Sequence, residues 1–102
     1  MSVLLANRTE SSAEFVNTAN IIYKMTIDFI IKLSARYSRL LAPSIAQAAS
    51  DLLVHAAKAN KIFPDDEDAL KLRRTHLLEA RSALSALDIQ LSHCVEILQM
   101  NP

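Results

Sequence analysis

Three histidines are the residues of this sequence whose side chains most readily bind a transition metal. They are His55, His76 and His93, and they are separated by 21 and 17 residues, so no His-x-x-x-His pair places two imidazoles on one face of a helix. Glu79 follows His76 by three residues, the reverse of the Glu-x-x-His order of di-iron helical bundles. The sequence therefore predicts no metal site.

Cys94 is the only cysteine and cannot form an internal disulfide, so a reducing cytoplasm is the expected compartment. A catalytic cysteine needs an activating base, and no motif supplies one here. Because Cys94 falls within a leucine repeat, we expect a small core residue rather than a nucleophile. The sequence predicts neither enzymatic activity nor a cofactor.

Four consecutive acidic residues, Asp65 to Asp68, follow Pro64. They could be interpreted as a cation site. Carboxylates at the start of a helix more simply cap free backbone N–H groups and complement the helix dipole. Glu67 and Lys71 also stand four residues apart in the order that stabilises a helix. We expect a helix start at this run rather than a metal site.

The composition indicates an all-α protein without a strong electric field. The 102 residues contain no glycine, which excludes the G-x-G-x-x-G and Walker loops, and three prolines. Eleven basic and eleven acidic residues cancel, so any nucleic-acid binding must come from a local patch. The most apolar window, residues 21–33, is interrupted by Lys24, Asp28 and Lys32, and the first residues lack the layout of a signal peptide. We expect no membrane segment and no secretion.

Apolar spacing of three and four residues predicts two helices in the first part of the chain, over about residues 11–34 and 43–62. Ser11 or Ser12 is the expected cap of the first helix. Residues 34–39 break the pattern and are expected to form the connection. Pro43 suits a first helical position, so it is expected to mark a helix start or a kink.

A third helix is predicted over about residues 66–99, where no glycine or proline interrupts the chain. Leucines recur every seven residues, with Ala80, Leu87 and Cys94 on the alternate seam. The leucine positions are Leu70, Leu77, Leu84, Leu91 and Leu98. A basic zipper is excluded, because the residues ahead of the repeat are acidic rather than basic.

The third predicted helix is longer than its neighbours, about 50 Å against about 36 Å for the first. Its far end is apolar and requires a cover, either a partner chain or a further element. We therefore expect a single domain, residues 1–102, that forms a homo-oligomer. The expected oligomer seam consists of Leu84, Leu91, Val95 and Leu98.

Basic residues gather in three stretches, the first connection, the end of the second helix and the start of the third, which could contact phosphate or an acidic partner. In an antiparallel hairpin, the end of the second helix and the start of the third lie side by side, which would bring Lys58, Lys61, Lys71 and Arg74 together. A solvated face neutralised by the acidic run is the alternative. The candidate binding residues are Arg36, Tyr37, Arg39, Lys58, Asn60, Lys61, Lys71, Arg73, Arg74 and Arg81.

Several short motifs resemble the Avd-like and ribosomal-RNA intervening-sequence family of four-helix-bundle proteins, which includes the accessory variability protein of diversity-generating retroelements. They are residues 8–11 (RTES), Arg36-Tyr37, residues 59–64 (ANKIFP), residues 72–74 (LRR) and Glu79-Ala80. The resemblance implies an antiparallel up-down bundle of the four-helix type. Three helices are evident here, and the family's fourth helix is absent from the 102 residues.

The resemblance further implies a non-enzymatic accessory protein that forms a homopentamer and binds a reverse transcriptase and its template RNA. The residues that carry this implication are Arg36, Tyr37, Asn60, Arg73 and Arg74. The alternative is a structural oligomerisation or adaptor module without a nucleic-acid role.

Overall fold

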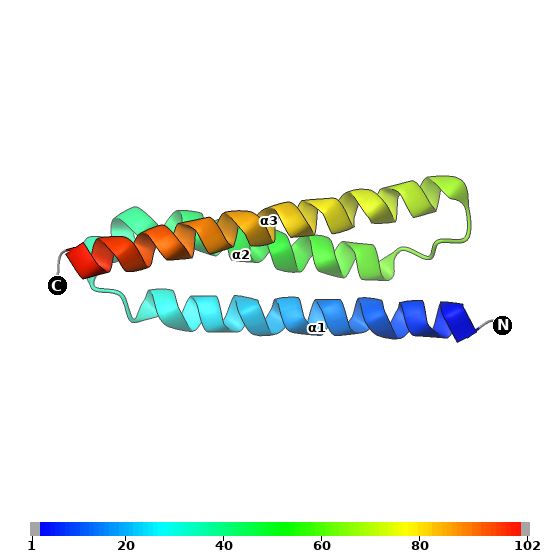
Figure 1. The fold of residues 1–102 in the computed structure, drawn as a ribbon, viewed down its shortest axis with the longest axis horizontal. Coiled ribbons are helices and arrows are strands. Elements are labelled where there is room, and N and C mark those ends of the chain that lie inside the picture. Colours follow the sequence, from blue (N-terminus) through cyan, green and yellow to red (C-terminus); the bar gives the residue numbers. More distant parts are fainter. Residues whose placement is uncertain (1–2, 101–102) are drawn as a thin grey trace.

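The protein is three long helices, seen in a computed structural model that describes residues 3–100, with side chains from residue 13 onward. Helix α1 spans Val3–Ile31, α2 spans Ala35–Lys61 and α3 spans Glu67–Met100. Successive helices run antiparallel, and the molecule measures 57 × 21 × 17 Å (Figure 1). The described residues contain no strand, which confirms the all-α class.

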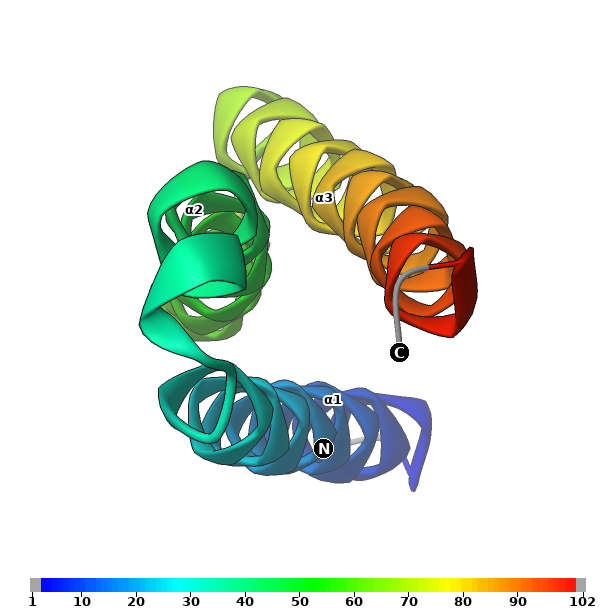
Figure 2. The same cartoon turned by 90° about the vertical axis from the view of Figure 1, so that its left-hand side faces the viewer.

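Helix α2 lies in the middle, and both α1 and α3 pack against it. Within residues 3–100, the backbones of α1 and α3 do not come into contact with each other. Viewed from the end, the three helices form an open arrangement in which the C-terminal half of α3 swings toward α1 (Figure 2). Among residues 3–100, no helix consequently closes the side of the bundle between α1 and α3.

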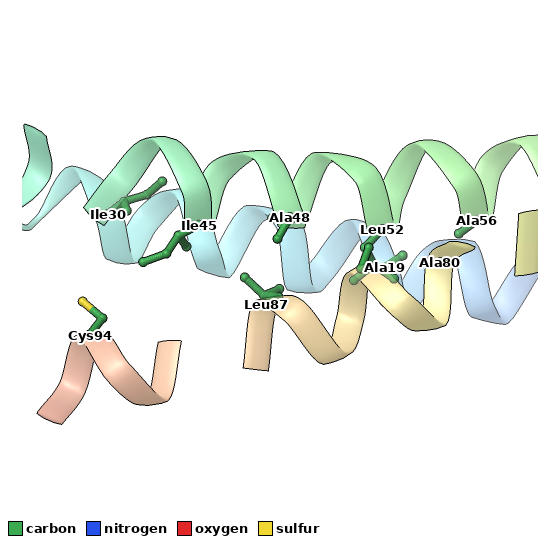
Figure 3. Packing of buried hydrophobic residues seen from close by; sticks show 11 residues of the cluster. Ala19, Ile30, Ile45, Ala48, Leu52, Ala56, Ala80, Leu87 and Cys94 are labelled. Atoms are coloured by element: carbon green, nitrogen blue, oxygen red, sulfur yellow. The ribbon is translucent and has the colours of Figure 1, made fainter. Parts of the chain in front are cut away.

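The core is rich in alanine, which lets the helices approach closely. Ala48, Leu52 and Ala56 of α2 face Ala80 and Leu87 of α3, and Ala19 and Ile30 of α1 lie behind them (Figure 3). Thr26 is the one polar side chain among the buried residues described, and its hydroxyl donates a hydrogen bond to the carbonyl oxygen of Ile22 at 2.7 Å. The buried polar atom is therefore satisfied.

The buried line of α3 is the alternate seam of the heptad repeat, not the leucine seam. Ala80, Leu87 and Cys94 are buried against α2, whereas Leu84 is 40% exposed. Leu91 and Leu98 are half-buried at the edge of the core. Small side chains occupy the close contact, and the leucines flank it on the side that opens toward α1.

The third helix begins and ends within one residue of its predicted bounds, and its cap is the predicted kind. The backbone N–H of Ala69 donates to Oδ1 of Asp66 at 2.7 Å. Glu67 and Asp68 occupy the first turn, where their charges complement the helix dipole. The interpretation of the acidic run as a helix start is confirmed.

The predicted bounds of the first helix and the predicted start of the second were wrong, whereas the predicted end of the second, residue 62, is confirmed to within one residue. Helix α1 already includes Ser11 and Ser12, the expected caps, and it ends at Ile31. Helix α2 starts at Ala35, immediately after Ser34 in extended conformation, so residues 35–39 are helical rather than a connection. Pro43 lies inside α2. A proline removes one backbone hydrogen bond, and a helix packed along its length tolerates that loss.

These bounds reduce the expected overhang. Helix α1 has 29 residues and α3 has 34, so α3 exceeds α1 by five residues, about 8 Å. The apolar end of α3 is only partly uncovered, since Ile97 and Leu98 are half-buried while Val95 is 45% exposed. Apolar surface is therefore uncovered both at this end, where Met100 is 78% exposed, and along the side of the bundle, where Met25 is 67% exposed.

Candidate functional site

Most of the ten predicted binding residues lie near one or the other end of α2. Arg36, Tyr37 and Arg39 lie in its first two turns, beside the α1–α2 connection. Lys58 and Lys61 lie in its last turn. The 22 residues from Arg36 to Lys58 correspond to about 33 Å of helix. One compact ligand cannot contact both groups, so they are separate surfaces.

At the first of these surfaces, an arginine and a tyrosine interact. Cζ of Arg36 lies 5.9 Å from the centroid of the Tyr37 ring, within the range of a cation–π interaction. Arg36 and Arg39 are exposed, and Tyr37 is half-buried. This surface contains two cations, against four at the other end of α2.

The second surface, which we call the basic end, consists of Lys58, Lys61, Lys71 and Arg74. The short connection after α2 folds α3 back along it, so the last turn of α2 and the first turns of α3 meet at one end of the molecule (Figure 1). All four side chains are exposed. Lys71, Arg74 and Arg81 follow one face of α3 at spacings of three and seven residues.

Two predicted residues near the basic end do not belong to it. Arg73 is half-buried, and its Nε atom is enclosed by protein. Asn60 instead lines a groove between α1 and α2 together with Asn17 and Asn20. Asp65 to Asp68 are exposed at the same end of the molecule and offset much of its positive charge. The basic end is therefore positive only where its four cations lie, and this end of the molecule as a whole is not strongly positive.

A second candidate surface is the apolar groove between α1 and α3. It has a volume of about 270 Å³ and is lined by Ile22, Met25, Thr26, Phe29 and Leu91. Met25 is 67% exposed, an unusual position for a large apolar side chain. The predicted seam residues Leu84, Val95 and Leu98 are on the same helix as Leu91, within two turns of it. Together these residues form a stripe with the size and character of a helix-binding site.

The structure brings together two histidines that the sequence analysis treated as unrelated. Nδ1 of His55 on α2 lies 3.0 Å from Nδ1 of His76 on α3. The ring centroids are 5.2 Å apart, and the ring planes are inclined by 28°. Both rings are half-buried. His55 stands six residues before the end of α2 and His76 nine after the start of α3, so antiparallel pairing brings them to nearby levels, and the register between the two helices decides their contact.

His55 also lines a larger, more polar groove between α2 and α3. The groove has a volume of about 560 Å³. Small residues such as Ala48, Ala83 and Ala86 lie beside polar ones, which include Gln47, Asp51, Glu79 and Gln90. Nε2 of Gln47 donates a hydrogen bond to Oδ1 of Asp51 at 2.8 Å. The groove gives solvent and small ions access to His55.

Cys94 is buried, as predicted for a core residue. Burial raises the pKa of its thiol, which disfavours the reactive thiolate. No three His, Cys, Asp or Glu side chains among the described residues come together as a complete metal-ligand set. Along residues 3–100, no helix combines the length and the low charge of a bilayer-spanning segment.

Comparison with known proteins identified no relative of this chain. No protein-family model matches it, and neither does any curated protein or solved structure.

Proposed function

We propose that this protein is a non-enzymatic helical accessory protein of the Avd-like kind, which binds a reverse transcriptase and contacts the template RNA. The motifs of residues 8–11, 59–64 and 72–74 support the family assignment. The three antiparallel helices are compatible with the four-helix type, with the open side between α1 and α3 as the position of a further helix. Assembly as a homopentamer belongs to the same proposal.

The observation that carries the proposal is the basic end. Four exposed cations from two helices meet there, in a chain whose total charge is zero. Lysine and arginine side chains at such a density are suited to phosphate contacts. The surrounding carboxylates limit the number of phosphate contacts. A short segment of RNA is therefore favoured over a long one.

A gel-shift titration with the template RNA at low salt tests the RNA contact. We expect binding by the natural chain and at least tenfold weaker binding by the double variant Lys71→Glu, Arg74→Glu. Lys24→Glu is the matched control, since Lys24 is an exposed lysine on α1. Absence of affinity even at low salt would remove RNA from the proposal. Co-purification with the reverse transcriptase tests the protein partner separately.

The second candidate is a structural oligomerisation module without a nucleic-acid role. The apolar groove between α1 and α3 favours it, because Met25, Leu84 and Val95 expose apolar surface that a second copy of the chain could cover. Leu91→Asp places a charge in this groove and should dissociate the oligomer, as measured by light scattering. Ile89→Asp is the control, because Ile89 is an exposed apolar residue of α3 outside the groove. A natural chain that is a monomer at all concentrations would contradict this candidate.

A further inference from the structure

We propose that His55 and His76 form a two-histidine site for a late first-row divalent metal ion, bound between α2 and α3. The proposal is independent of the reverse-transcriptase role, since neither histidine belongs to the basic end or to the apolar groove. It begins from the 3.0 Å separation of the two Nδ1 atoms.

The two Nδ1 atoms now point nearly at each other, since the ring centroids are 5.2 Å apart, and a rotation of both rings would direct them at one metal ion without a large change in their separation. Zinc lies about 2.0–2.1 Å from a histidine nitrogen, so two such nitrogens are about 2.9 Å apart at a right angle and about 3.4 Å apart in a tetrahedron. The observed 3.0 Å lies within this range and closer to the right angle. Cis positions of that kind are typical of Ni²⁺ and Cu²⁺, and a small opening of the pair accommodates Zn²⁺.

The hydrogen bond between the two rings permits metal binding without the release of a proton. In the metal-free protein, one imidazole donates its Nδ1–H to Nδ1 of the other. A metal ion requires both Nδ1 atoms to be unprotonated, so the donating ring must carry its proton on Nε2 instead. The proton moves within the donating ring from Nδ1 to Nε2, so none is released, and the ion then binds both Nδ1 atoms.

The surroundings of the pair supply solvent and nearby negative charge. Asp51 stands one helical turn before His55, Glu79 stands three residues after His76, and both line the groove that reaches His55. Their negative charges offset that of the ion, whereas Lys58, one turn after His55, opposes it. Since no third ligand of the described residues is in place, water occupies the other coordination positions.

Bound metal would link the two helices of the α2–α3 hairpin. The ion binds the folded chain and not the unfolded one, where the 21-residue separation keeps the histidines apart. Such a ligand stabilises the folded chain by RT ln(1 + L/Kd), where L is the free metal concentration, so the thermal midpoint rises with the free metal concentration. The hairpin ends in the basic end, so the metal would also fix the relative position of its two helices.

Thermal unfolding of the full chain with added Zn²⁺ or Ni²⁺ tests the proposal. For a chain of this size, Tm should rise by about 6 °C or more when free metal reaches ten times its Kd. We expect His55→Asn and His76→Asn each to abolish the rise, and His93→Asn to retain it. His93 is an exposed histidine of α3 and serves as the matched control. Mg²⁺, which prefers oxygen ligands, should cause no comparable shift.

Comparing each variant with and without metal keeps the result interpretable if a substitution lowers Tm by itself. Two results would overturn the proposal. One is a natural chain whose Tm is unchanged at millimolar Zn²⁺ and Ni²⁺. The other is a metal-induced rise of equal size in the His55→Asn and His76→Asn variants, which would place the metal elsewhere.

Discussion

Cys94 shows how the environment of one residue decides its chemistry. Its thiol is buried within the α2–α3 contact, and burial raises its pKa, so less thiolate is present at any pH than in an exposed cysteine. We predict that iodoacetamide alkylates Cys94 in the folded chain at least about tenfold more slowly than in the chain unfolded by guanidinium chloride at the same pH. Mass spectrometry measures both rates. Equal rates would mean that the thiol is accessible in the folded protein.

Asp66 carries one hydrogen bond that starts a helix. Its carboxylate accepts from the N–H of Ala69, which has no partner within the helix. Asp66→Ala should lower the free energy of unfolding by about 1 kcal/mol, as measured by urea denaturation. Asp65→Ala removes a neighbouring exposed carboxylate outside the helix and should have less effect. If both variants lose the same stability, the acidic run acts through its charge alone.

At the scale of the helix, the two heptad seams of α3 should contribute differently to the free energy of unfolding. Leu87 is buried against α2, whereas Leu84 is 40% exposed. Leu87→Ala should cost about 2–5 kcal/mol, the range for large-to-small substitutions in a core, and Leu84→Ala should cost clearly less. Urea denaturation at low protein concentration, where self-association is weakest, measures the difference. Equal losses would mean that the leucine seam is a second core contact.

The helices were predictable from the sequence because apolar spacing and the absence of glycine both favour them. Helix α3 was placed within one residue, since Pro64 and the acidic run mark its start. The connection between α1 and α2 was misplaced because it contains neither glycine nor proline. Ser34 breaks the helix by its extended conformation alone. Pro43, a strong breaker in isolation, lies within a helix that packing stabilises on both sides.

The candidate surfaces were only partly predictable for a related reason. The basic end could be predicted because consecutive helices pack antiparallel, and that arrangement depends only on the order of the helices along the chain. The His55–His76 pair requires the register between α2 and α3, and the spacing of 21 residues does not reveal it. The division of the heptad into a buried and an exposed seam depends on how α3 crosses α2. Such crossing angles are set by side-chain packing, which a linear repeat does not encode.

For the whole molecule, zero net charge constrains how RNA could be bound. A neutral chain provides no long-range attraction, so affinity must come from the side chains that touch phosphates. Each neutralised phosphate of a single strand contributes about 0.7 to the slope of log K against log salt. With four cations at the basic end, we predict a slope of magnitude about 2.8 at most.

The variant Lys71→Gln, Arg74→Gln removes two of these four cations and should lower the slope by about 1.4. Fluorescence anisotropy of a labelled template RNA over a range of salt concentrations measures both slopes. Arg36→Gln with Arg39→Gln is the control, because this pair lies at the opposite end of α2. A slope well above 2.8 in the natural chain would mean that RNA contacts more cations than the basic end contains. If the control lowered the slope equally, both ends would contact RNA, and binding would then need a strand long enough to cover about 33 Å of helix.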